Sequence, residues 1–369
     1  MLPSEISLTT LRIFALLTDG YGVEGGIGRY NVALLNALGS DATRAVTVLA
    51  RRAVLPAHES CERICHLSPS GSKLGLVVST VWQALLGRHH EVVFCGHINM
   101  LPLAWVLARR WRAKLWVQMH GIECWERPGS HIRAIAERAD LITCVSRYTR
   151  RRVLEWCDIE PSNARVLPNT LSQQFDIPSR PRSVGTSSAT DLTRPLRALT
   201  VARLSADERY KGHDVMIEAI ALLGSRGVPV EYVIAGDGDD RPRLELLAQR
   251  LGVSHCVSFV GRVSEADLPS LYDQADVFVM PSTGEGFGIV FLEARQRGCA
   301  VIASNADGSV DPLRDGADGY LVPPKDPHAL ADLLRTVAPS WVAPSVSANI
   351  FSRQSFAAHV NRLLQQSIC

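Results

Sequence analysis

The chain has 369 residues, of which 46% are hydrophobic and 21% charged, and this balance is typical of a globular protein with two domains. Its net charge is +2, but residues 1–190 carry 22 Lys/Arg against 15 Asp/Glu, whereas residues 191–369 carry 17 against 22. No apolar run reaches the roughly 20 residues that cross a bilayer, no basic signal segment is visible, and the nine cysteines form no CxxC pair. We therefore expect a cytoplasmic protein with reduced thiols.

The first half alternates apolar runs with helical patterns. Strands are expected at 11–17, 45–50, 91–96, 114–119 and 141–146, and helices near 29–38, 72–87, 100–112, 130–139 and 147–157. This rhythm predicts a parallel sheet with helices on both faces. We expect an N-terminal Rossmann-like domain over residues 1–177.

A segment rich in Pro, Ser, Thr and Gly then predicts a linker at 178–195. The rhythm restarts with strands expected at 197–202, 230–236, 257–261, 276–280 and 300–304. A second doubly wound α/β domain is expected over 196–345, followed by a helix in 346–369. Such sheets bind ligands beyond the carboxyl ends of their strands, so the site is expected in a cleft between the two domains.

Basic residues follow the first strand of the second domain. Arg203 lies at the strand exit, and Lys211 and Gly212 lie at the next helix start. A guanidinium and an ammonium beside a helix N-terminus suit a diphosphate, although single charges of this kind are more often solvated. Gly236 and Gly238 at the next strand exit allow close approach of a ligand to the backbone or a sharp turn.

Two carboxylates flank a glycine-rich helix start in the stretch PSTGEGFGIVFLEARQRG. Glu285 precedes the helix, Glu293 lies inside it, and Gly286 and Gly288 would let a ligand reach the N–H groups between them. Because carboxylates repel a diphosphate, we expect each to accept hydrogen bonds from vicinal hydroxyls. A ligand with phosphates in its middle and diols at both ends is a nucleotide-sugar.

Two features of the first domain also follow strands. The turn GVEGGIGRYN contains Gly25, Gly26 and Gly28, but it has neither the GK[ST] ending of a P-loop nor the GxGxxG spacing of nicotinamide enzymes. His120 follows the strand at 114–119, a place where a histidine is about as often functional as structural.

Assembled in this order, the sequence resembles the retaining family 4 glycosyltransferases of the GT-B fold, with two Rossmann-like domains facing across a cleft. VARLSADERYKGHD, IAGDGDD and DGADGYLVPP fall in the order of that family, and EGGIGRYN, HGIE, VSRYT and VLPNT are similar in the first half. The most specific element is the E-x7-E motif formed by Glu285 and Glu293.

The resemblance implies an acceptor side in the first domain and a donor side in the second, with no metal or other cofactor. Arg203 and Lys211 would bind the diphosphate, with Arg209 able to replace or assist either. The residues implied in donor binding are Gly25, Gly26, Arg203, Lys211, Val263, Glu285, Gly286, Phe287, Gly288, Ile289 and Glu293. The residues implied in catalysis are His120, Arg203, Lys211 and Glu285.

The expected activity moves a hexosyl unit from a GDP-mannose or UDP-glucose type donor to a glycan or polyprenyl-linked saccharide, in bacterial polysaccharide or lipopolysaccharide synthesis. Asp237 and Asp239 leave open a metal-dependent glycosyltransferase of the other fold, since they match its D-x-D pattern. The sequence is also compatible with an epimerase, a phosphorylase or a non-catalytic nucleotide-sugar-binding protein.

Arginine alternates with Trp and Tyr in residues 103–116 and 146–156. This pattern predicts either peripheral binding to the anionic inner membrane or a solvated helix face whose Arg stems cover apolar surface. Nucleic acid is not expected as a partner, because no recognition motif appears.

Overall fold

The computed structural model describes residues 10–23, 25–54, 62–175, 194–340 and 350–368. The chain divides into two units, Met1–Thr170 with Phe351–Cys369, and Leu171–Ile350. All but the last two residues of the linker expected at 178–195 lie outside the described residues.

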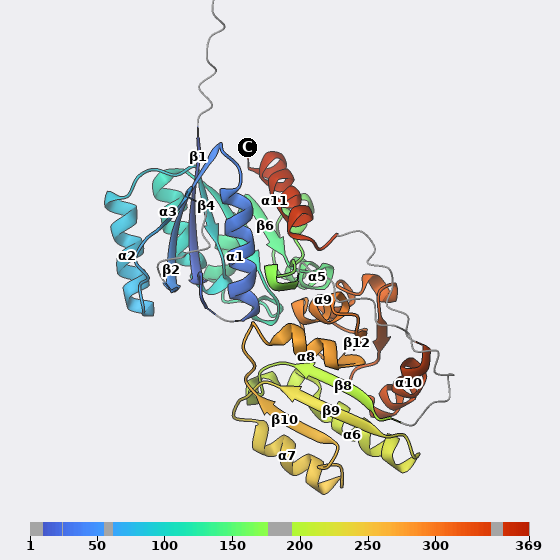
Figure 1. The fold of residues 1–369 in the computed structure, drawn as a ribbon. Coiled ribbons are helices and arrows are strands. Elements are labelled where there is room, and N and C mark those ends of the chain that lie inside the picture. The colour runs from blue at the N-terminus through green and yellow to red at the C-terminus, as the bar shows by residue number, and fades with distance from the viewer. Residues whose placement is uncertain (1–9, 24, 55–61, 176–193, 341–349, 369) are drawn as a thin grey trace, which may run out of the picture. The chain divides into compact units, whose positions relative to one another are not determined.

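The first unit contains a seven-stranded parallel sheet of order β3-β2-β1-β4-β5-β6-β7, of which Figure 1 labels β1, β2, β4 and β6. Its strands are β1 (Leu11–Asp19), β2 (Arg44–Arg52), β3 (Ile64–His66), β4 (Val92–Cys95), β5 (Lys114–Met119), β6 (Leu141–Cys144) and β7 (Ala164–Val166). Its helices are α1 (Gly26–Gly39), α2 (Lys73–Leu86), α3 (Leu101–Trp111), α4 (Ser130–Ala136), α5 (Arg147–Leu154) and α11 (Arg353–Ser367). The five strands predicted here are confirmed, whereas β3 and β7 were not predicted.

The central strands are buried on both faces, as their continuous apolar sequences require. In β1 the residues from Ile13 to Leu17 have no exposed surface. Helix α11 returns from the end of the chain to pack against α1, where the rings of Tyr30 and Phe356 lie 5.8 Å apart. The Thr170 hydroxyl also donates to the Phe351 carbonyl oxygen at 2.7 Å. The C-terminal helix is therefore part of the first unit.

The second unit contains a six-stranded parallel sheet of order β10-β9-β8-β11-β12-β13. Its strands are β8 (Leu196–Val201), β9 (Val230–Ala235), β10 (Val257–Gly261), β11 (Val277–Met280), β12 (Ala300–Ser304) and β13 (Tyr320–Val322). Its helices are α6 (His213–Ser225), α7 (Arg241–Arg250), α8 (Leu268–Gln274), α9 (Ile289–Gln296) and α10 (Pro327–Ser340). All five strands predicted in this half are confirmed.

Each sheet is doubly wound, as the sequence predicted, and its strand order reverses at one point. In the first sheet the reversal lies between β1 and β4, and in the second between β8 and β11. At such a point the connections of the two strands run to opposite faces of the sheet, and ligands bind in the crevice beyond the carboxyl ends of the strands. In the second unit these two loops carry Arg203 to Gly212 and Pro281 to Gly288.

Candidate functional site

Lys211 lies between two carboxylates at the reversal point of the second sheet. Its Nζ is 3.6 Å from Oε2 of Glu208 and 3.6 Å from Oε2 of Glu285, and the three side chains expose 15%, 13% and 18% of their surface. Arg203 is 74% exposed and donates a hydrogen bond to Glu208. We call Arg203, Glu208, Lys211 and Glu285 the Lys211 cluster. It combines two cations with two anions, so it carries no net charge.

Contacts between the two loops bring Lys211 to Glu285. The N–H of Thr283 donates to the carbonyl oxygen of Tyr210 at 2.7 Å. Gly212 has a φ of 81°, and a Cβ there would lie 2.6 Å from the carbonyl oxygen of Pro281. A Cβ on Gly284 would lie 2.8 Å from the Tyr210 ring. Glycine is therefore required at both places for the loops to approach each other.

The backbone of Glu285 is held by Asp307, which follows β12. Asp307 is 2% exposed, and its Oδ2 accepts from the N–H of Glu285 at 2.8 Å and from the hydroxyl of Ser282 at 2.6 Å. Its Oδ1 accepts from the N–H of Ser309 at 3.0 Å. The N–H of Gly308 returns a hydrogen bond to the carbonyl oxygen of Glu285 at 2.9 Å. The loop after β12 therefore fixes the backbone of Glu285.

Helix α9 begins directly after the glycine-rich stretch. Gly288 precedes it with a φ of 82°, and Phe287 is buried beneath the turn. Within the described chain, no group accepts a hydrogen bond from the N–H of Gly288 or Ile289. Unpaired N–H groups at a helix N-terminus favour an anion or an oxygen ligand. Gly286, whose carbonyl oxygen would meet a Cβ on Gly308 at 2.0 Å, is tightly enclosed.

Glu293 occupies a different environment from Glu285. It has no exposed surface, and Oε2 accepts a hydrogen bond from the hydroxyl of buried Tyr272 at 2.9 Å. Val263 is partly buried and packs against the hydrophobic cluster that contains Tyr272 and Phe175. Glu293 and Val263 therefore adjoin one apolar region, whereas Glu285 belongs to the polar Lys211 cluster.

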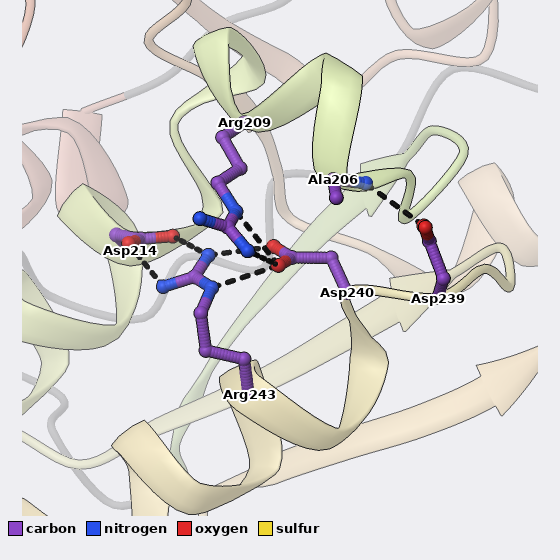
Figure 2. A network of polar contacts seen from close by, with 6 residues as sticks. All are labelled: Ala206, Arg209, Asp214, Asp239, Asp240 and Arg243. Carbon is purple, nitrogen blue, oxygen red and sulfur yellow. Dashed lines mark hydrogen bonds and ion pairs between the residues drawn. The ribbon is translucent and has the colours of Figure 1, made fainter.

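Arg209 does not join the Lys211 cluster. Its guanidinium donates to Oδ1 of Asp240 at 2.8 Å, and Arg243 donates to Asp240 at 2.6 Å and bridges to Asp214 at 2.7 Å (Figure 2). Asp240 is 3% exposed, and the hydrogen bonds from Arg243 and Arg209 lower its pKa against the effect of burial. This network connects the segment Ala206–Lys211 to α6 and α7. Arg209 thus positions the loop that carries Lys211.

The two aspartates of the D-x-D pattern are engaged with neighbouring protein groups. Asp239 Oδ1 accepts from the N–H of Ala206 at 2.8 Å, a contact also drawn in Figure 2. Asp237 Oδ1 accepts from the N–H of Gly238 at 3.0 Å and lies 3.9 Å from Nη1 of Arg241. Gly236 has a φ of 147°, and a Cβ there would lie 1.8 Å from the carbonyl oxygen of Ala202. These contacts shape the loop after β9 against the loop after β8.

In the first unit, His120 follows β5 and is held on three sides. Its Nε2 donates to the carbonyl oxygen of Gly96 at 3.0 Å, its own N–H donates to Glu123 at 2.7 Å, and its ring stands edge-on to Tyr30 at 5.0 Å. Burial lowers the pKa of His120 to about 4. Near neutral pH the ring is therefore uncharged, with the proton on Nε2 and a lone pair on Nδ1 that can accept a hydrogen bond.

The glycine turn after β1 lies at the start of α1. Gly25 has a φ of 117°, and a Cβ on Gly25 or Gly26 would meet nothing within 4 Å. A Cβ on Gly28 would instead lie 2.3 Å from the carbonyl oxygen of Val23. Gly28 is therefore required by the fold, whereas the space at Gly25 and Gly26 is open to a ligand.

We expect stability to fall as the pH drops from about 6.5 to about 4. Burial lowers the pKa values of His90, His120 and His213 from 6.5 to about 4. Between these values the unfolded chain binds more protons than the folded one, so their contribution is complete above pH 6.5 and is lost as the pH falls through 4. Asp307, whose pKa burial raises, acts in the opposite direction, but it is a single group, and burial also lowers the pKa values of His66, His97 and His359.

Urea unfolding across this pH range measures the effect. His213→Gln should make the decline shallower, because it removes one of the three histidines. A free energy of unfolding that stays constant from neutral pH to pH 4 would contradict the assignment of three neutral buried imidazoles.

Seven cysteines lie in the described residues, and all seven are free thiols. Five of them are buried, and Cys65 is exposed. The described part of the chain also contains no group of three potential metal-ligating side chains. Among the described helices, none is long and apolar enough to cross a membrane.

Two doubly wound α/β domains in one chain, each with the strand order given above, are typical of the GT-B fold. Sucrose-phosphate synthase from Thermosynechococcus elongatus superposes with a TM-score of 0.75 over 96% of this chain and 98% of that one, at 22% sequence identity. Anabaena HepE in complex with UDP superposes with a TM-score of 0.73 over 96% of this chain and 100% of that one, at 20% identity.

The sequence comparisons identify the family. The model described as "Glycosyl transferases group 1" matches residues 191–341, and that of "Glycosyltransferase Family 4" matches residues 24–174. The GDP-mannose-dependent alpha-(1-6)-phosphatidylinositol monomannoside mannosyltransferase of Mycolicibacterium smegmatis is 32% identical over 268 residues, 69% of each chain. The chain belongs to the family 4, group 1 glycosyltransferases, as the sequence motifs predicted.

Other relatives match over shorter segments. The D-inositol 3-phosphate glycosyltransferase of Corynebacterium urealyticum is 38% identical over 162 residues, which cover 41% of this chain and 38% of that one. The enzyme of the same name from Corynebacterium jeikeium is 30% identical over 63% of this chain and 58% of its own length. The matched segments therefore cover less than two thirds of the length of these two relatives.

Proposed function

We propose that this protein is a retaining hexosyltransferase that uses a nucleotide-diphosphate sugar of the GDP-mannose or UDP-glucose type. The observation that carries the proposal is the Lys211 cluster beside the unpaired N–H groups that open α9. Two cations and a helix N-terminus suit a diphosphate, and carboxylates next to them suit sugar hydroxyls. The GDP-mannose dependence of the Mycolicibacterium relative and the UDP bound to Anabaena HepE support this class of donor.

Lys211 and Arg203 would hold the donor diphosphate. In the free protein both cations are paired with Glu208, and Arg203 is exposed on a flexible stem. A diphosphate would take the place of Glu208 as the partner of Arg203, while Lys211 stays between Glu208 and Glu285. Because the ammonium is already oriented, its charge is available to the leaving group without reorganisation.

The two carboxylates would divide the hydroxyl groups of the donor. Glu285, with the backbone of Gly286, Phe287, Gly288 and Ile289, would bind the sugar. Glu293 would accept from the ribose, with the Tyr272 hydroxyl keeping its carboxylate in place. Val263, which adjoins the same apolar region, would lie by the base.

The first unit would supply the acceptor side and three further contacts. His120, neutral near pH 7, would accept a hydrogen bond from a sugar hydroxyl through Nδ1. Gly25 and Gly26 would allow a close approach to phosphate oxygens, since neither has a neighbouring atom where a Cβ would be.

The transfer would proceed by attack on the face from which the diphosphate departs. The bond from the anomeric carbon to the diphosphate oxygen breaks, and the acceptor hydroxyl oxygen bonds to the same carbon and passes its proton to the departing phosphate. Glu285 is the one carboxylate of the Lys211 cluster that would face the sugar, and its ion pair with Lys211 favours hydroxyl binding over nucleophilic attack. Lys211, Arg203 and the N-terminus of α9 would stabilise the developing negative charge.

The acceptor is proposed to be a glycan or a lipid-linked saccharide, such as a polyprenyl-linked repeat made for bacterial polysaccharide or lipopolysaccharide. The phosphatidylinositol monomannoside named for the Mycolicibacterium relative supports a lipid-linked class. We further propose a cytoplasmic protein that works at the inner membrane and requires no metal.

Titration of the purified protein with UDP-glucose, UDP-N-acetylglucosamine and GDP-mannose in EDTA tests the proposal. One ligand should raise the melting temperature, because binding to the native state alone stabilises by about 2.7 kcal/mol at 100 times Kd. Glu293→Gln retains an oxygen for Tyr272 but weakens ribose binding, so affinity should fall roughly tenfold. Glu245→Gln, an exposed residue paired with Arg241, is the matched control.

The outcomes distinguish a metal-free site from a metal-dependent one. A shift that appears only with Mn²⁺ would return Asp237 and Asp239 to consideration as metal ligands. No shift with any donor, with or without Mn²⁺, would overturn the proposal.

A further inference from the structure

Helix α2 has an exposed apolar face. Seven of the fourteen large hydrophobic side chains that are exposed in the described residues lie on this one helix. Their exposed fractions are Leu74 73%, Val77 41%, Val78 61%, Val81 46%, Trp82 62%, Leu85 66% and Leu86 67%. Their spacing of three and four residues places them along one side of a helix about 21 Å long.

The opposite side of α2 is already packed. Leu76, Thr80 and Ala84 are buried, four residues apart, and α2 contacts α3 and β2. A helix that is apolar on every side is ordinarily buried on every side, and a large exposed apolar patch marks an interaction surface. Among the described residues, the outer face of α2 is therefore the part of the first unit with the most exposed large apolar side chains.

The charge around α2 indicates which partner. Between residues 63 and 122 the sequence contains seven Lys/Arg and a single acidic residue, Glu91. Lys73 begins α2, Arg88 follows it, and Arg109, Arg110 and Arg112 end the adjacent α3; all five are exposed. No described residue forms an ion pair with any of these five side chains. The surface thus combines apolar side chains with unneutralised positive charge.

We propose that the outer face of α2, with the arginines at the end of α3, docks the protein on an anionic lipid surface. Leucine and tryptophan side chains on a helix that lies along an interface enter the acyl boundary, while basic residues around them attract anionic headgroups. A second copy of the chain fits less well, since a symmetric dimer through α2 would bring the same basic residues together.

The structure also corrects the surface suggested by the sequence. In one of the two interpretations given above, residues 103–116 and 146–156 contact lipid, but Trp111, Trp116 and Trp156 are buried, and Trp105 and Tyr148 pack against the core. Exposed arginines remain in both segments, at the end of α3 and on α5, where Arg151 lies over the Tyr148 ring at 4.9 Å. The apolar part of the surface lies on α2 instead, where the sequence shows no arginine.

Vesicle flotation of the full chain tests the docking surface. The vesicles contain phosphatidylcholine alone or with about one third phosphatidylglycerol. We expect binding to the anionic vesicles that weakens with added salt, and a fall of at least about tenfold when Trp82, Leu85 and Leu86 are all replaced by serine. Exchange of Arg109 and Arg110 for glutamate should remove the preference for anionic lipid.

The matched control replaces three exposed hydrophobic residues of the second unit, Leu246, Leu251 and Val260, by serine. It should bind vesicles as the parent protein does, and the melting temperature of each variant reports its folding. The docking surface is part of the membrane-linked function proposed above, but the assay contains neither donor nor acceptor. Its failure would therefore leave the proposed transfer intact.

Three results would overturn the proposal. The first is that the parent protein does not bind anionic vesicles. The second is that the α2 variant binds them as tightly as the parent does. Alternatively, the parent would sediment as a dimer that the α2 substitutions dissociate without any lipid binding, which would identify a second copy as the partner.

Discussion

Replacement of Lys211 by alanine should weaken binding of the nucleoside diphosphate about a hundredfold and slow sugar transfer by roughly a thousandfold. The ammonium is mostly buried and lies 3.6 Å from carboxylates on both sides. Its removal takes away the charge that would meet the leaving group and leaves Glu208 and Glu285 facing each other without a cation between them. Both effects oppose an incoming diphosphate. Calorimetric titration with UDP and GDP measures the first loss without knowledge of the acceptor.

Lys114→Ala is the control for the loss of a lysine. Lys114 is 54% exposed and forms one pair with Asp140, so its removal should change stability by less than about 1 kcal/mol and leave binding unchanged. Lys211→Arg should recover only part of the activity, because a planar guanidinium cannot occupy the position of a compact ammonium between two carboxylates. Diphosphate affinity within about threefold of the parent in Lys211→Ala would show that this lysine is a structural member of the loop.

Much of the fold could be predicted because long apolar runs in a parallel sheet are read directly from sequence. The strands at 114–119, 257–261 and 300–304 were predicted to the residue, because each is a short, mainly apolar segment between polar ones. The edge strands β3, β7 and β13 were not predicted. Each has three residues and owes its extended form to pairing with a longer neighbour, which no local pattern records.

The candidate site could be predicted in outline by the rule that ligands meet the carboxyl ends of strands. That rule selected Arg203, Lys211 and Glu285, which the structure brings together. The contacts between these three side chains could not be predicted, because they depend on other residues of the chain. Glu208, which bridges the two cations, lies three residues before Lys211 but was not singled out, since an acid in a basic loop looks solvated.

The choice between Arg209 and Lys211 likewise depends on distant residues. Asp240, on the loop before α7, is the partner that draws Arg209 away from the cluster. Asp307 was missed for a different reason. Asp307 follows β12 and therefore lies at the carboxyl end of a strand. The neighbouring sequence contains no cation or glycine pattern that would suggest a role for it.

Asp307→Ala should lower the free energy of unfolding by about 4 kcal/mol and reduce sugar transfer about a hundredfold. Its buried carboxylate accepts from the N–H groups of Glu285 and Ser309 and from the hydroxyls of Ser282 and Ser309. Alanine leaves the two N–H groups and the Ser282 hydroxyl without this acceptor at a buried position, whereas the Ser309 hydroxyl keeps the carbonyl oxygen of Ser304. Because one of them is the N–H of Glu285, the carboxylate beside Lys211 would lose its fixed position as well.

The conservative variants separate the two effects. Asp307→Asn keeps one acceptor oxygen but turns an amide towards N–H donors, so it should cost about half as much stability as alanine. Ser282→Ala removes one hydroxyl donor and should cost about 1 kcal/mol with little change in transfer, because the N–H of Glu285 keeps its partner. Asp332→Ala, at an exposed pair with Arg226, should alter neither property. Urea unfolding measures the stability of each variant, and kcat measures its sugar transfer. If Asp307→Ala were as stable as Asp332→Ala, the Asp307 carboxylate would not be the group that holds Glu285 in place.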